Sequence, residues 1–159
     1  MGAEMEQPDR KRLRLEDFDY AGNGYYFITI CTRDMQNLFI QPVGNGHARS
    51  CAGRIAEENL LAIPTHFPHV VIDKYVIMPN HVHAILVIEG ACAERVCPFP
   101  TLSTVVGSYK SSVSKAVGFP VWQKSFYDHV IRNESDYQMI WQYIENNPVK
   151  WELDRFYME

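Results

Sequence analysis

The chain has 159 residues and is 47% hydrophobic, with 15 Lys and Arg residues against 19 Asp and Glu residues for a net charge of −4. A chain of this length buries roughly 68–70% of its unfolded surface when it folds. One ordinary globular domain is therefore expected, and a disordered, collagen-like or disulfide-dependent small protein is excluded. The acidic balance argues against a protein that coats nucleic acid indiscriminately, because such binding relies on Lys and Arg contacts to phosphate.

The sequence predicts a cytoplasmic location. No apolar run approaches the roughly 18 residues that a membrane span requires, and the N-terminal segment lacks the hydrophobic stretch of a secretory signal. Four cysteines are present without any C-x-x-C spacing: Cys31, Cys51, Cys92 and Cys97. In a reducing compartment we expect free thiols at these positions rather than metal ligands.

Residues 1–24 are polar and contain Gly22 and Gly24, which predicts an N-terminal arm ahead of a single domain at residues 25–159. Four cations fall within five positions of this arm: Arg10, Lys11, Arg12 and Arg14. A basic arm of this kind could reach a DNA backbone. The alternative is a solvated basic tail beside the acidic residues that follow it.

The first half of the domain predicts three strands and one helix. Residues 25–32 (YYFITICT) are β-branched and aromatic without helical periodicity, which indicates a buried strand. Apolar residues recur at three- and four-residue spacings over 51–63, which predicts an amphipathic helix closed by Pro64. Residues 70–78 and 81–88 predict two antiparallel strands, because only Pro79 and Asn80 separate them and both suit a tight turn.

The second half predicts two helices and a strand. Residues 101–117 favour a helix weakened by Gly107 and several serines, and the alternation over 122–132 favours a fourth strand. Asn133 is a suitable N-cap for a last helix with two acids in its first turn, and this helix should end near Asn147, because Pro148 disfavours α geometry in the residue before it.

The order of these elements, β-α-β-β-α-β and a further helix, predicts an α+β fold of the ferredoxin-like, split β-α-β type. We expect a four- to five-stranded antiparallel sheet, helices on one face, and an extra C-terminal helix that bears Tyr143. This fold hosts many functions, so it identifies none by itself.

His81 and His83 open the third predicted strand directly after a tight turn. Because strand side chains alternate with a period of two, both imidazoles should project from one face, about 7 Å apart along the strand. Two nitrogens there could share one metal ion. The alternative for an H-x-H pattern is a pair of hydrogen-bonded structural histidines.

The last predicted helix places a tyrosine and an amide on one flank. Its apolar stripe contains Tyr137, Ile140, Trp141 and Ile144. Tyr143 lies about 110° from the centre of this stripe, and Asn147, four residues further on, lies nearly above it. The alternative is a tyrosine that covers the rim of the core with its hydroxyl in water.

Together these residues suggest a phosphodiester chemistry. Two imidazoles and an amide oxygen could bind a divalent cation that polarises a phosphodiester, and Tyr143 could attack phosphorus. A free phenol, with a pKa near ~10, needs such assistance at neutral pH. Mn²⁺ and Mg²⁺ are both expected candidates, and Zn²⁺ is a weaker one.

Other residues could take part in this chemistry. Tyr127 shares a predicted strand face with His129, so it is a rival nucleophile to Tyr143. Three further cations could contact DNA: Lys110, Lys115 and Arg132. Each of the three could equally be an ordinary solvated charge.

Four ordered motifs resemble the single-tyrosine HUH transposases of the insertion-sequence-200-like type, most closely the REP-associated tyrosine transposases. The motifs are RLRLEDFDYAGNGYYFITICTRDMQNLF, VIMPNHVHAILVI, GSYKSSVSK and WQKSFYDHVIRNESDYQMIWQYIENNPVKW. The resemblance covers residues ~10–155, almost the whole chain, and several motifs in order are more specific than H-x-H alone. The acidic net charge is a departure from what is usual for an enzyme that acts on DNA.

The resemblance implies roles for four residues. His81 and His83 match the HUH metal ligands, Tyr143 in the Tyr-Ile-x-x-Asn-Pro block matches the nucleophile, and Asn147 matches the third ligand. The implied reaction is metal-dependent cleavage of single-stranded DNA near hairpins, through a 5′-phosphotyrosine and a 3′-hydroxyl that later joins strands. A domesticated hairpin-binding protein without turnover and a hydrolase that uses water remain alternatives.

Relatives of this type occur as dimers that exchange the tyrosine helix and as monomers that use their own. The short predicted loop at residues 132–134 favours a self-contained site, although the choice between a homodimer and a monomer stays open.

Overall fold

The computed structural model describes residues 24–43, 46–89 and 100–158. The cations of the predicted arm, Arg10, Lys11, Arg12 and Arg14, lie outside the described residues, and so do Cys92 and Cys97. Cys31 and Cys51 are free thiols. Within the described ranges, no helix combines the length and the hydrophobicity needed to cross a membrane.

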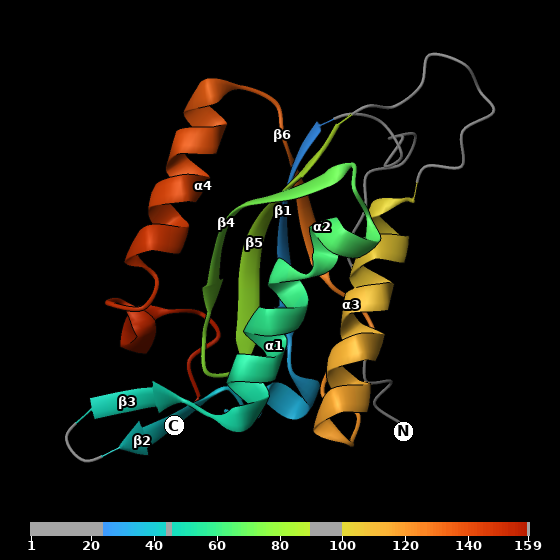
Figure 1. The fold of residues 1–159 in the computed structure, drawn as a ribbon. Helices are drawn as coiled ribbons and strands as arrows, with labels where there is room; N and C mark the ends of the chain where they lie inside the picture. Colours follow the sequence, from blue (N-terminus) through green and yellow to red (C-terminus); the bar gives the residue numbers. More distant parts are fainter. Residues whose placement is uncertain (1–23, 44–45, 90–99, 159) are drawn as a thin grey trace, which may run out of the picture.

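Four antiparallel strands form the central sheet, in the order β4-β5-β1-β6 (Figure 1). Their bounds are β1 Gly24–Cys31, β4 Val70–Ile77, β5 His81–Ile88 and β6 Tyr127–Ile131. β5 and β1 occupy the centre, and the two strands that are adjacent in sequence, β4 and β5, form a hairpin. This arrangement confirms the predicted α+β fold class and its antiparallel sheet.

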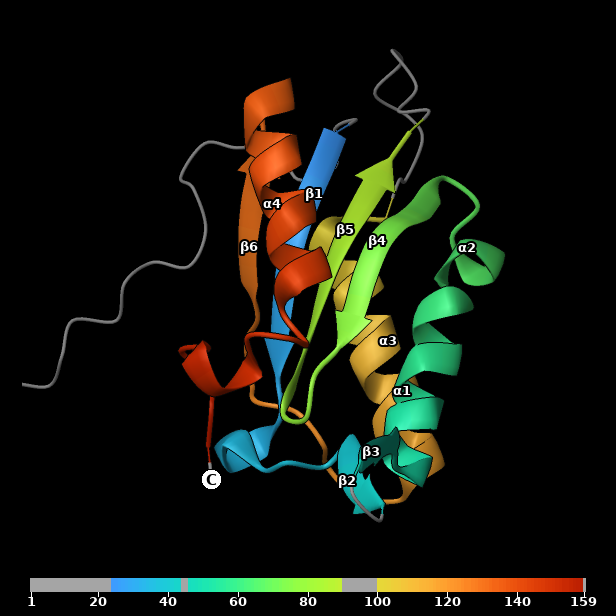
Figure 2. The ribbon, with the colours of Figure 1, turned by 90° about the vertical axis from the view of Figure 1, so that its left-hand side faces the viewer.

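Helices cover the two faces of the sheet unequally. α1 (Cys51–Leu61) and α3 (Leu102–Val117) pack on one face, and α4 (Glu134–Asn146) lies against the other (Figure 2). The prediction of helices on one face and an extra C-terminal helix is therefore confirmed. The candidate tyrosine, Tyr143, is on α4. Among the long helices of the described ranges, α4 is the one that lies on this face of the sheet.

Strand alternation assigns each side chain of the central strands to one of these faces. The core beneath α1 and α3 takes alternate residues of β1 and β5: Tyr26, Ile28, Ile30, Val82, Ala84 and Leu86. The intervening residues, including Thr29, His81 and His83, face α4. All eight residues of β5 are buried, because this central strand is covered on both faces.

The helix boundaries follow capping chemistry. The Asn133 side chain accepts a hydrogen bond from the Asp136 N–H at 2.8 Å, which confirms it as the N-cap of α4. The predicted helix 51–63 with Pro64 as its closing residue is wrong in detail. α1 ends at Leu61, and Pro64 lies in the first turn of a short helix, α2 (Ile63–His66). Proline is tolerated there because no helical partner is required for its missing N–H.

Two further details differ from the sequence prediction. The expected strand 122–132 is regular only over β6, although Trp122 forms an isolated bridge with Thr32. A second pair of antiparallel strands, β2 (Ile40–Val43) with β3 (Gly46–Arg49), lies in a stretch for which the sequence predicts no regular element. This hairpin is largely exposed, so it carries no apolar alternation that could reveal it. Short 3₁₀ turns, η1 (Arg33–Met35) and η2 (Trp151–Leu153), complete the described elements.

Candidate metal and tyrosine site

The two histidines of the H-x-H motif meet at the start of β5. The Nε2 atoms of His81 and His83 lie 3.0 Å apart, and both imidazoles are fully buried. Both side chains are on the α4 face, as the strand period predicts. Two nitrogens bound to one ion at ~2.1 Å, at a right angle, would also stand ~3.0 Å apart, so this spacing suits a shared cation.

Neighbouring polar groups orient both rings. The Asn80 amide nitrogen donates to the carbonyl oxygens of Met35 and Phe156, so its Oδ1 faces the Nδ1 atom of His81 at 2.8 Å. Because Oδ1 only accepts, the proton of His81 is on Nδ1 and its Nε2 presents a lone pair. The Thr29 hydroxyl lies 2.7 Å from Nδ1 of His83 and holds that ring. Such outer hydrogen bonds are usual for metal-binding imidazoles.

Burial keeps both imidazoles neutral at pH 7. Desolvation lowers the pKa of His81 from 6.5 to about 4. The Asp154 carboxylate raises this pKa in part, and the Arg155 guanidinium lowers it further. The pKa of His83 is also well below 6.5, first because of burial and then because of its neighbours His81 and Arg155. Neutral imidazole is the form that binds metal ions.

Tyr143 reaches this histidine pair from α4. Its hydroxyl oxygen lies 3.3 Å from Nε2 of His83 and donates a hydrogen bond to Oδ2 of Asp154, also at 3.3 Å. The ring packs edge-on against His83 and Phe27, while 41% of the residue stays exposed. Burial raises the phenol pKa above 10, so the hydroxyl is protonated at neutral pH. The nearby Asn147 amide opposes this rise, although no hydrogen bond of normal geometry joins the two side chains.

The Asn147 amide is buried at the C-terminal end of α4. Only 3% of the residue is exposed, and within the part of the chain that the structure describes neither Oδ1 nor Nδ2 has a partner. An unsatisfied buried amide destabilises a fold by roughly 1–3 kcal/mol unless something binds it. Asn147 also lines the cavity beside Tyr143, so a group that enters this cavity can satisfy its oxygen. The third-ligand role of Asn147 stays a prediction from the resemblance.

A carboxylate completes the donor set. One oxygen of Asp154 lies with ligand nitrogens of His81 and His83 in a group whose members are all within 4.8 Å of one another. Two imidazoles and a carboxylate are a suitable donor set for Mn²⁺ and other divalent cations. The residues therefore fit a divalent metal site.

The segment after α4 covers the imidazoles. The Phe156 ring lies 4.6 Å from the ring of His81, and Trp151 lies 5.9 Å from it on the same segment. Hydrogen bonds from Asn80 to the Phe156 carbonyl (2.7 Å) and from Asn37 to the Met158 carbonyl (3.0 Å) fix this segment. The site is thus enclosed by α4 and the chain that follows it.

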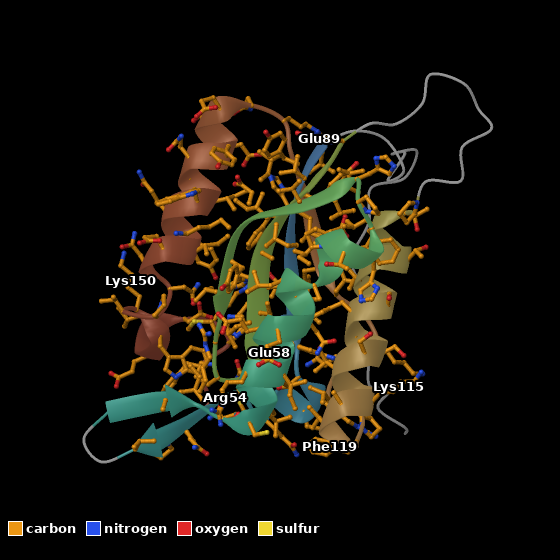
Figure 3. All side chains as sticks on the ribbon, viewed as in Figure 1. Arg54, Glu58, Glu89, Lys115, Phe119 and Lys150 are labelled. Carbon is orange, nitrogen blue, oxygen red and sulfur yellow. The ribbon has the colours of Figure 1, made fainter. Side chains whose placement is uncertain are left out.

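A cavity of about 470 Å³ opens beside the tyrosine. Its lining includes Tyr143 of α4 and Asn147, the C-cap of that helix. Lys150, Asp154 and Arg155 of the following segment also line it. Figure 3 shows Lys150 below α4, across the molecule from Lys115 on α3. Two cations therefore border the cavity where a phosphate group could approach the site.

The rival nucleophile Tyr127 has different surroundings. It pairs with Thr29 across β6 and β1, and 45% of it is exposed. Its ring lies 5.8 Å from the Arg155 guanidinium, and His129 is bound to Asp136 of α4 at 2.8 Å. Among the described residues, Tyr143 is the tyrosine whose hydroxyl contacts the histidine pair.

The three cations predicted to contact DNA do not gather at this site. The Lys110 ammonium donates to the carbonyl oxygens of Gln123, Lys124 and Ser125, and burial lowers its pKa. Lys115 projects from the opposite side of the molecule, and Arg132 lines a separate cavity at the N-terminus of α4. DNA binding by these residues stays a prediction.

Sequence reasoning missed four residues that surround the histidine pair: Thr29, Asn80, Asp154 and Arg155. Asn80 could have been found, because it lies in the turn next to His81, and Thr29 lies opposite His83 in the register of β1 and β5. Asp154 and Arg155 had no such signal, since no period relates them to α4.

Comparison with known proteins agrees with this architecture. No family model matches the sequence. An uncharacterized protein of Haemophilus influenzae is 34% identical over 169 aligned positions, which cover 94% of each chain. A candidate REP-associated tyrosine transposase of the same organism is 25% identical over 83% of this chain and 74% of its own length.

A solved structure of a REP-associated tyrosine transposase bound to a REP hairpin superposes with a TM-score of 0.64. The match covers 83% of this chain and 70% of that one, at 23% sequence identity. The chain therefore belongs to the same family as the 34% identical Haemophilus influenzae protein, and it has the fold of the REP-associated tyrosine transposases that its sequence resembles.

Proposed function

We propose that this protein is a transposase-type enzyme that cleaves and joins single-stranded DNA near hairpins with Tyr143 as its nucleophile. One observation carries the proposal: the Tyr143 hydroxyl lies 3.3 Å from Nε2 of His83, at the one described cluster whose donors suit a divalent cation. The similar transposase whose structure contains a REP hairpin supports hairpin DNA as the substrate class.

The chain's own residues supply most of the chemistry. His81 and His83, with Asn147, would hold a divalent cation at the buried end of the site. When bound, this cation supplies a Lewis acid for the scissile phosphodiester. The Tyr143 oxygen forms a bond to phosphorus as the bond from phosphorus to the 3′ oxygen breaks. The phenol proton leaves, and the departing 3′ oxygen takes up a proton.

This step conserves the energy of the phosphodiester in a 5′-phosphotyrosine. A 3′-hydroxyl of another strand can then attack the same phosphorus, release the Tyr143 oxygen and join DNA without an external energy source. Lys150 and Arg155 border the cavity at the tyrosine, so we assign them the binding of backbone phosphates during both steps.

The proposed site is complete within one chain. Tyr143 of α4 contacts His83 of the same chain, and the short connection from β6 to α4 allows this. A monomer can therefore carry out the reaction without exchange of α4 between subunits.

Covalent capture of DNA tests the proposal. The full chain is incubated with Mn²⁺ or Mg²⁺ and a panel of hairpin-bearing single strands labelled at the 3′ end, because a 5′-phosphotyrosine retains the downstream fragment. We expect a labelled adduct that resists denaturation in SDS. It should disappear with EDTA and with Tyr143→Phe, whereas the matched control Tyr127→Phe should retain it.

The other outcomes identify the alternatives. Hairpin binding without an adduct under either metal would support a domesticated binding protein. Cleavage that survives Tyr143→Phe but is lost with His81→Ala would support a hydrolase that uses water. Loss of the adduct with Tyr127→Phe and its survival with Tyr143→Phe would show that the nucleophile is assigned to the wrong tyrosine.

A further inference from the structure

Asp154 contacts more of the site than its position in sequence suggests. The residue follows η2, in the segment that covers the imidazoles. Its Oδ1 accepts the Phe156 N–H at 2.8 Å, which fixes the carboxylate at the end of this segment. Its Oδ2 accepts the hydrogen bond from the Tyr143 hydroxyl at 3.3 Å.

The same carboxylate is within reach of the histidine pair. One of its oxygens and the ligand nitrogens of His81 and His83 lie within 4.8 Å of one another. The carboxylate is the acidic member of this group, and imidazoles bind a metal ion in their neutral form. Neutral ligands alone would leave the full charge of a divalent cation in a buried place, which is unfavourable. Among the described residues, the buried Asn147 amide makes no hydrogen bond of normal geometry, which is a second sign that the enclosed space receives a ligand.

We propose that Asp154 is a ligand of the same cation and that its hydrogen bond with Tyr143 ties the nucleophile to the ion. This inference rests on the proposed function, and it adds a carboxylate to the ligands that the resemblance implies. Because Phe156 fixes Oδ1, the other oxygen is the one shared between the phenol and the ion. Asp154 is thus both a metal ligand and a positioning residue for Tyr143.

Metal affinity provides the first test. Binding of Mn²⁺ to the full chain, without DNA, is measured by the loss of the free-ion signal in electron paramagnetic resonance. We expect Asp154→Asn to weaken binding about 10- to 100-fold. The asparagine keeps an Oδ1 for the Phe156 N–H, so the fold should survive, and thermal melting checks this. The matched control is Glu152→Gln, which removes an exposed carboxylate from the same segment.

The second test follows the tyrosine itself. With tyrosine labelled at ¹³Cζ, and the Tyr143 signal assigned from Tyr143→Phe, titration of the full chain with Mg²⁺ should shift this signal. In Asp154→Asn at saturating Mg²⁺ the shift should be largely lost. Asp154→Glu, which restores the charge, should recover part of both the affinity and the shift.

The outcomes separate this inference from the function on which it rests. If Asp154→Asn binds Mn²⁺ as tightly as the wild type while His81→Ala does not, the carboxylate is no ligand and the metal site stands. An unchanged Tyr143 shift in a weakly binding Asp154→Asn chain would refute the positioning role alone. If both His81→Ala and His83→Ala bind Mn²⁺ normally, the metal site of the proposed function is itself wrong.

Discussion

The two faces of the central sheet differ in composition although the same strands build both. Under α1 and α3, β5 contributes Val82, Ala84 and Leu86 to a close-packed apolar core. On the α4 face the same strand contributes His81 and His83, which contact polar side chains. The buried Asn147 amide, which follows α4, has no hydrogen-bond partner among the described residues. One face therefore stabilises the fold through apolar burial, and the other holds reactive groups that this stability keeps in place.

This division predicts that substitutions on the two faces separate metal binding from stability. The largest effect is expected for His83→Ala, which removes a proposed ligand. Its Mn²⁺ affinity should fall by at least about 100-fold. Substitution of a residue that only hydrogen-bonds to a metal ligand already lowers metal affinity by up to about 100-fold, and loss of the ligand itself should cost more. Titration calorimetry measures this change, and His66→Ala, at an exposed imidazole on α2, is the matched control. Equal losses in both variants would mean that Mn²⁺ binds elsewhere.

The converse is expected for Leu86→Ala, on the apolar face of the same strand. Leu86 is fully buried, so the truncation should lower the free energy of unfolding by about 3 kcal/mol. The folded fraction should bind Mn²⁺ with unchanged affinity. Urea denaturation followed by metal titration measures both quantities. A variant that keeps its stability but loses metal binding would contradict the division between the faces.

Acid should weaken the α4 face of the metal-free protein. The pKa of His81 is lowered from 6.5 to about 4, so between these values the unfolded chain binds more protons than the folded one. Above pH 6.5 the imidazole is neutral in both states, so His81 causes no loss of stability there. As the pH decreases from 6.5 toward 4, the free energy of unfolding falls by about 1.4 kcal/mol per pH unit for each such histidine. Urea midpoints at pH 7 and 5 measure this decrease. The decrease in the urea midpoint from pH 7 to pH 5 should be smaller in His81→Gln than in the wild type. An equal decrease in the two proteins would show that His81 does not contribute.

The smallest effect is expected for Thr29→Val, which keeps the shape of the side chain and removes the hydroxyl at Nδ1 of His83. Metal affinity should fall about 10-fold, because the ring loses the group that orients it. Stability should fall by only about 1 kcal/mol, the usual net value of one hydrogen bond. Calorimetry and thermal melting measure the pair of changes. A stability loss without any change in affinity would make Thr29 purely structural.

The parts of the site that follow a local period could be predicted from sequence. The strand period placed His81 and His83 on one face, and the helical period placed Tyr143 and Asn147 on one flank of α4. Pattern alone also gave the four sheet strands and the three long helices. These features share a cause, since each is set by neighbours within one turn or one strand.

Features set by tertiary docking could not be predicted in this way. Asp154 and Arg155 reach the site because Asn80 and Asn37 bind the carbonyl groups of the following residues, and no spacing in the sequence encodes those contacts. The β2–β3 hairpin was not predicted, because its exposed strands lack an apolar alternation. The end of α1 was predicted wrongly at Pro64, because proline can follow the end of one helix or lie in the first turn of the next.

The rings of Phe156 and Trp151 beside His81 have a consequence for the order of assembly. These rings pack against His81, so in the proposed mechanism a cation would enter from the cavity at Tyr143 and Asp154, where the scissile phosphate would also lie. A bound DNA strand would then obstruct the loading of the cation, so we expect the cation to bind before the DNA. Pre-incubation with metal should give a faster onset of cleavage than pre-incubation with DNA.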